Sequence, residues 1–104
     1  MATLTQALAR RAAPTSSATL YTVPTTTTIT VVSNIVLSNA ATSASTATIA
    51  FDGVTIVPAV SIPANSVVGF DMKQVIPANA TPKIITGFAS TTAVSIHISG
   101  VEIS

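Results

Sequence analysis

Apolar and polar residues alternate along most of this chain, and the pattern is clearest between residues 46 and 57. Two alternating runs meet there at Asp52-Gly53, a dipeptide that strongly favours a two-residue hairpin turn. The turn predicts an antiparallel hairpin whose opposed residues are Phe51 with Val54, Ile49 with Ile56, and Ala47 with Pro58.

The two faces of this hairpin follow from its register, because neighbouring side chains of a strand point to opposite sides. One predicted face is apolar and carries Ile49, Phe51, Val54 and Ile56. The other face carries the smaller Thr48, Ala50, Thr55 and Val57. Because this second face is uncharged, we expect another subunit to be able to cover it.

The longest alternating run covers residues 28–38. Its better core face holds Ile29, Val31, Ser33, Ile35 and Leu37. The opposite face still carries Val32 and Val36, which we therefore expect to contact a partner rather than water.

Further strands are predicted at residues 18–23, between the two IPAN segments at 62–65 and 76–79, at 83–89, and at 93–104. In each IPAN segment, proline and asparagine suit a turn in which Asn takes a left-handed conformation. The apolar phase of the last strand changes at Gly100, which predicts a β-bulge there. All three Phe are expected on core faces.

The sequence thus predicts an all-β fold, an antiparallel β-sandwich or jelly roll of about seven or eight strands with an N-terminal arm. The arm would cover residues 1–17, and the β-sandwich domain residues 18–104.

Residues 1–15 differ in composition from the rest of the chain. Leu4, Leu8 and Arg11 have helical spacing, and Pro14 would end a helix. One interpretation is a frayed terminus. The other is an arm of helix or extended chain that docks on a neighbouring subunit. Leu4 and Leu8 would anchor this arm, and Arg10 and Arg11 would pair with carboxylates across the contact.

Charge is scarce, since charged residues form 7% of the chain and its formal net charge is +1. Ordinary soluble domains contain roughly 25% charged residues. We infer either burial in an assembly or export, and the missing export signal favours the assembly. No nucleic-acid partner is expected without a basic patch, and no membrane partner without a long apolar run, although mean hydropathy is +0.69.

The chain offers little for catalysis. His97 is the only histidine, and Ser95 and Ser99 on its own strand face lie about 7 Å from it by strand rise. The three acids are Asp52, Asp71 and Glu102, and Asp52 is explained by its turn. We therefore expect no enzyme, no metal site and no cofactor; without cysteine, thiolate ligands are excluded. Tyr21 is the one aromatic residue without an assigned core position.

Several short motifs resemble those of small β-rich virion proteins of tailed bacteriophages, encoded among head and tail structural genes. They are Leu20-Tyr21-Thr22-Val23-Pro24, the strand ending at Ser38-Asn39, Pro63-Ala64-Asn65, and Ser99-Gly100-Val101-Glu102-Ile103. The resemblance spans roughly residues 20–103 and leaves the N-terminal segment outside it. It implies a structural protein of the virion with no catalytic residues, and an oligomer, in many cases a trimer.

Together these features favour a capsid decoration, or cement, protein that binds the major capsid protein and bridges its subunits on the capsid surface. The candidate interface residues are Leu4, Leu8, Arg10, Arg11, Val32 and Val36. A tail or fibre module that contacts the host surface is the main alternative. A carbohydrate-binding β-sandwich is the third.

Overall fold

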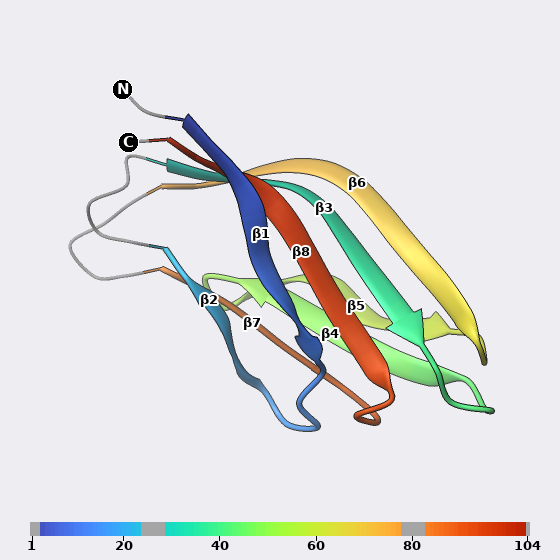
Figure 1. Cartoon of the computed structure of the whole chain (residues 1–104). Coiled ribbons are helices and arrows are strands. Elements are labelled where there is room, and N and C mark those ends of the chain that lie inside the picture. The colour runs from blue at the N-terminus through green and yellow to red at the C-terminus, as the bar shows by residue number, and fades with distance from the viewer. Residues whose placement is uncertain (1–2, 24–28, 78–82, 104) are drawn as a thin grey trace.

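Eight strands form two four-stranded sheets in a computed structural model of the chain (Figure 1). The structure describes residues 3–23, 29–77 and 83–103. The strands are β1 (Thr3–Ala12), β2 (Ala18–Thr22), β3 (Ile29–Asn39), β4 (Ser45–Phe51), β5 (Val54–Ile62), β6 (Ser66–Pro77), β7 (Ile84–Ala89) and β8 (Val94–Ile103).

All six pairs among the described strands are antiparallel. Four of them are nested: β1 pairs with β8, β2 with β7, β3 with β6, and β4 with β5. In addition, β3 pairs with β8 and β4 with β7. The strand order is β1-β8-β3-β6 in one sheet, here sheet A, and β2-β7-β4-β5 in the other, sheet B. A long hairpin rolled up in this way is an eight-stranded jelly roll. Its tip is the Asp52-Gly53 turn. The predicted all-β antiparallel sandwich or jelly roll is therefore confirmed.

The segment expected to form an arm supplies strand β1 instead. Residues 3–12 are extended, as one version of the prediction had it, but they pair with β8 of the same chain. Leu8, Ala9 and Ala13 are buried in the core. The helical spacing of Leu4, Leu8 and Arg11 was misleading, because the edge of β8 offers unpaired backbone groups that a strand satisfies. Among the described residues, no arm stands apart from the sandwich.

The core lies between the inner faces of the two sheets. Its fully buried members come from both sheets, and the largest are Ile35, Leu37, Ile49, Ile62, Ile85, Ile96 and Ile98. Phe51, Phe70 and Met72 are partly buried and pack against this core. Phe88 is the exception to the predicted Phe positions: it lies on the outer face of sheet B and is 36% exposed.

A row of irregular positions crosses sheet A beside Gly100. Relative to β8, strand β1 has one extra residue at Leu8, and β3 has one extra at Ser33. Strand β6 has one more than β3, because Val32 pairs with Gln74 and Asn34 with Asp71. Extra residues on successive strands bend a sheet, and Figure 1 shows β3 and β6 arching over sheet B.

This bend reverses the predicted faces in the first half of β3. The inner face carries Ile35 and Leu37, as predicted, but before Ser33 it carries Thr30 and Val32, which are both fully buried. Ile29 and Val31 are only half-buried. The single bulge residue shifts the alternation by one position. Residues that alternate regularly in the sequence therefore lie on opposite faces of the sheet before and after Ser33.

The hairpin of β4 and β5 keeps the predicted turn but not the whole predicted register. Asp52 and Gly53 both have positive φ, 52° and 80°, as a type I′ turn requires. Phe51 pairs with Val54 as predicted, whereas Ile49 pairs with Val57. The pairing of Ile49 with Ile56 was therefore wrong, as was that of Ala47 with Pro58, since Ala47 pairs with Val60.

The shifted register changes which residues of β5 are buried. Val57 points into the core and is 3% exposed, whereas Ile56 is 37% and Val54 71% exposed. The predicted apolar face of Ile49, Phe51, Val54 and Ile56 therefore holds only on β4.

Candidate functional site

The outer face of sheet B is formed by strands without charged side chains. None of its four strands contains a charged residue. The face presents threonine hydroxyls and small apolar groups, with Ile56 and Phe88 exposed among them. We call this surface the sheet B face.

An open hollow of about 240 Å³ lies on the sheet B face. Its lining is rich in hydroxyl groups and consists of Ser17, Thr48, Ala50, Gly53, Thr55, Thr86, Gly87 and Phe88. The cross-strand pairing explains why they meet, because Ala50 of β4 lies opposite both Thr55 of β5 and Thr86 of β7. The hollow can therefore receive a small polar ligand or a projecting side chain of a partner.

Charged residues lie instead on sheet A and at the hairpin tip. Lys83 Nζ contacts the Asp52 carboxylate at 3.0 Å beside the turn. Such exposed pairs contribute about 0–1 kcal/mol. The backbone N–H of Asp52 also donates to the Ile84 carbonyl at 2.8 Å. Asp52 thus has a structural role, as its turn position predicts.

The candidate interface residues are divided between core and surface. Leu8 is 7% exposed and Val32 fully buried, so neither can contact a second molecule, and both assignments need correction. Each lies at or next to a bulge, which turned its side chain inward.

The other candidates lie on strands of sheet A. Leu4 belongs to β1, where its backbone pairs with Glu102. Arg10 and Arg11 are exposed near the end of β1, and Arg11 Nε donates to the adjacent Ala12 carbonyl at 3.3 Å. Val36 is half-buried on the outer face of β3. The structure thus leaves three of the described side chains, those of Arg10, Arg11 and Val36, accessible on sheet A.

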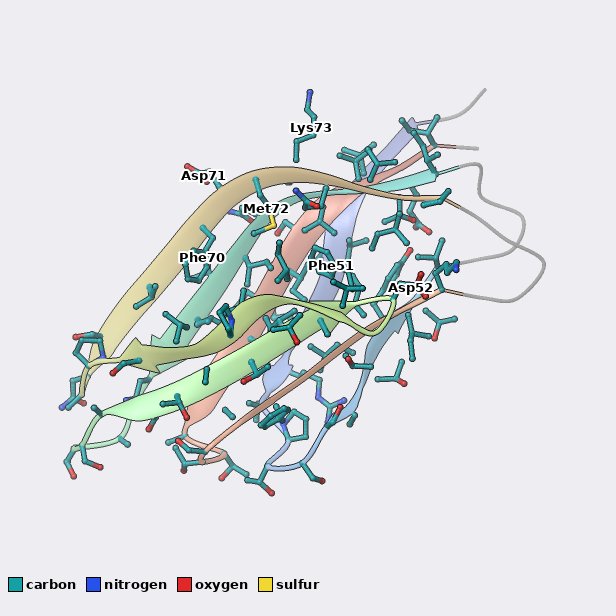
Figure 2. The ribbon with its side chains drawn as sticks, turned by 180° about the vertical axis from the view of Figure 1, so that it is seen from behind. Phe51, Asp52, Phe70, Asp71, Met72 and Lys73 are labelled. Atoms are coloured by element: carbon teal, nitrogen blue, oxygen red, sulfur yellow. The ribbon has the colours of Figure 1, made fainter. Side chains whose placement is uncertain are left out.

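His97 lies on the outer face of β8, between Arg10 of β1 and Val36 of β3. In the described part of the chain, no group of three or more His, Asp or Glu side chains is placed to hold a metal ion. The acids face different directions. Asp71 projects outward from β6 (Figure 2), whereas Glu102 of β8 binds Tyr21 of sheet B.

Tyr21 and Glu102 tie the two sheets together. The Tyr21 hydroxyl on β2 donates a hydrogen bond to the Glu102 carboxylate on β8 at 2.5 Å. Burial raises the pKa of Tyr21 to about 12, helped by its bond to Glu102 and by the negative charge there, while the Thr30 hydroxyl acts in the opposite direction. Sequence reasoning missed this pair and left Tyr21 without an assigned position. Its hydroxyl is instead engaged inside the chain.

The chain contains one tyrosine and no tryptophan, so the pKa of Tyr21 can be read directly from ultraviolet absorbance. We expect a phenolate transition with its midpoint near pH 12 rather than the ordinary 10.0. Glu102→Gln removes the carboxylate charge and should lower the midpoint, though not to 10.0, because burial is the larger cause. Tyr21→Phe should abolish the transition.

The raised pKa of Tyr21 should also make the free energy of unfolding depend on pH. The folded protein holds the phenol proton more tightly than the unfolded chain does, so the free energy of unfolding should be constant below about pH 10 and fall between pH 10 and 12. Denaturant titrations at several pH values measure this fall, and Tyr21→Phe should reduce it. A wild-type phenolate midpoint near pH 10, with circular dichroism showing a folded chain, would contradict the assigned environment of Tyr21.

No family model and no curated protein matches this chain in sequence comparisons. Within the described residues, no helix is long and apolar enough to cross a membrane.

Proposed function

We propose that this chain is a structural protein of a bacteriophage virion that binds the capsid surface and bridges neighbouring subunits of the major capsid protein. The observation that carries the proposal is the sheet B face, whose four strands contain no charged residue. Surfaces that remain in water usually carry interspersed charges of both signs. An uncharged, hydroxyl-rich face is suited to lie against another protein.

Bridging would stabilise a capsid through contact area at the junctions between its subunits. A protein that binds only the assembled shell shifts the equilibrium toward that shell in proportion to its binding free energy. The jelly roll also occurs in viral capsid proteins and in lectins, which supports the proposal by analogy of fold alone. The sequence motifs that resemble phage virion proteins point in the same direction, and they also imply self-association.

The test is a charge placed on the sheet B face. Thr86→Lys, at the centre of this face, should weaken attachment to purified capsids by at least about tenfold, since a buried unpaired charge costs several kcal/mol. Ser95→Lys is the matched control, because Ser95 is also half-buried but lies on the outer face of sheet A. Melting curves of both variants should match that of the wild type and so test whether the fold is retained.

Cryo-electron microscopy of particles then locates the protein. Density on the head is the expected result. Density confined to the tail would replace the proposal with a tail or fibre module, and equal attachment of Thr86→Lys and wild type would exclude the sheet B face as the contact.

The hollow favours one second candidate, a carbohydrate-binding domain. Its hydroxyl groups can bond to a sugar, and Phe88 offers an exposed ring against which a sugar can pack. Phe88→Ala should then abolish retention on a glycan array, whereas Tyr21→Phe should not. If the wild-type protein retains no glycan, this candidate fails.

A further inference from the structure

Strand β6 borders sheet A along 12 residues, from Ser66 to Pro77 (Figure 1). Among the described strands it pairs with β3 on one side only. The backbone groups along its other side form an edge that can accept another strand. Val67 and Val75 of this strand are 65% and 55% exposed. The edge therefore combines unpaired backbone with exposed apolar side chains.

Two opposite charges lie at the middle of this edge strand. Figure 2 shows Asp71 and Lys73 projecting from β6 away from the interior, whereas Phe70 and Met72 point toward it. Asp71 and Lys73 therefore share the outer face, with Met72 between them, although β6 carries its extra residue relative to β3 in this stretch. Both are exposed.

We propose that β6 pairs in antiparallel register with β6 of a second copy of this chain, around a two-fold axis at Met72. In this arrangement Asp71 of each copy lies directly opposite Lys73 of the other, which gives two equivalent ion pairs on the outer face. The two copies of sheet A join into one continuous sheet of eight strands. The interface is isologous, so it closes at two copies.

Charge selects this register over its neighbours. In a register that keeps outward side chains outward, the two-fold axis passes through a residue of β6. The two registers nearest to the one at Met72 therefore have their axis at Asp71 or at Lys73. The first would set two carboxylates opposite each other, and the second two ammonium groups. Opposed like charges destabilise a strand pair, whereas opposite charges stabilise it. Of the three registers, the one centred on Met72 alone places opposite charges together.

The apolar residues agree with the same register. Val75 of one copy falls opposite Gly69 of the other, which has no side chain to obstruct it, and Val67 falls opposite Pro77. Both exposed valines then lie beside the second copy. The bend in β6 is also compatible, because a two-fold axis perpendicular to the sheet relates two strands that arch in the same direction (Figure 1).

This pairing is independent of the proposed virion function, since it concerns only two copies of this chain. It also differs from the three-fold assembly that the sequence resemblance implies, so the two can be distinguished by mass.

The test is a pair of charge reversals, D71K and K73D, with mass measured by analytical ultracentrifugation and native mass spectrometry. The wild type should be a dimer. Each variant alone places like charges opposite each other, so its dissociation constant should rise at least about tenfold. An equimolar mixture of D71K and K73D should recover dimers containing one copy of each, because every opposed pair then has opposite charges. R10E, an exposed charge reversal on the other border of sheet A, is the control and should leave the dimer unchanged.

Rescue by mixing separates the pairing from damage to the fold, since neither variant alone can supply the missing charge. The proposal fails if the wild type is monomeric up to about 1 mM. It also fails if the wild type forms trimers, if both variants dimerise as the wild type does, or if the mixture remains monomeric while each variant keeps a native melting curve.

Discussion

Gly100→Ala should destabilise the protein by about 3 kcal/mol or more. A Cβ at this position would lie 2.2 Å from the Val31 carbonyl oxygen of β3 and 3.0 Å from Leu8 Cδ1 of β1. The nearest obstacle is backbone, which cannot rotate away as a side chain does. For a domain of this size such a loss lowers the melting temperature by more than about 10 °C. Thermal and denaturant unfolding of the two proteins measure it.

Two further variants isolate the cause. Gly69→Ala on β6 introduces the same methyl group where the nearest atom is Val36 Cγ2 at 3.9 Å, an ordinary contact. We expect a change within about 0.5 kcal/mol there when both proteins are compared as monomers. Leu8→Ala combined with Gly100→Ala should not restore stability, because the Val31 carbonyl remains. If the double variant recovers, the clash is with the side chain and the explanation is wrong.

The sequence located this irregularity but assigned it to the wrong strand. The apolar phase changes at Gly100, and a glycine at such a position predicts a bulge. In the structure the alternation of β8 continues through Gly100, and the extra residues are Leu8 and Ser33 on the strands beside it. A bulge is a relation between two strands, so the sequence of one strand cannot show which of them carries the extra residue.

Strand β1 was missed for a related reason. Its sequence, TLTQALARRA, does not alternate in the manner of the other strands, and its alanines and arginines favour helix. What makes it a strand is the free edge of β8, which lies about 90 residues later in the chain. Most strands that alternate clearly were predicted with nearly correct bounds, because there local pattern and tertiary burial agree. The exception is β5, which continues past the predicted end of the hairpin to Ile62.

The surface features differ in how far they were predictable. The sheet B face is uncharged because its four strands contain no Asp, Glu, Lys or Arg. This property can be predicted from the sequence as soon as it is known which strands form sheet B. The Tyr21–Glu102 bond spans 81 positions and depends on two sheets meeting at that point. No local pattern encodes it. The apolar Val101 and Ile103 on either side of Glu102 suggest that this carboxylate faces away from the core, whereas it reaches Tyr21 of the opposite sheet.

Asn39→Ala should be the second large loss, about 2–4 kcal/mol. Asn39 is 2% exposed at the end of β3. Its Nδ2 donates to the carbonyls of Ser43 at 3.0 Å and Ile62 at 3.1 Å, with Pro63 at 3.3 Å. Its Oδ1 accepts from the Ala41 N–H at 2.9 Å. Alanine would leave several of these backbone groups without a partner inside the protein, which costs more than the bonds themselves contribute.

The same side chain holds two segments from different sheets, so its loss should also be visible locally. The loop after β3 and the end of β5 meet at Asn39, and the Asn65 N–H donates to the Ala41 carbonyl at 3.1 Å beside it. In Asn39→Ala, amide exchange should accelerate first at Ala41 and Asn65.

Asn39→Asp keeps the acceptor but turns a carboxylate oxygen toward carbonyls, so it should be at least as destabilising. Asn34→Ala, on the outer face of the same strand, should cost less than about 1 kcal/mol. Equal losses at Asn34 and Asn39 would show that the buried bonds of Asn39 do not hold the segments together.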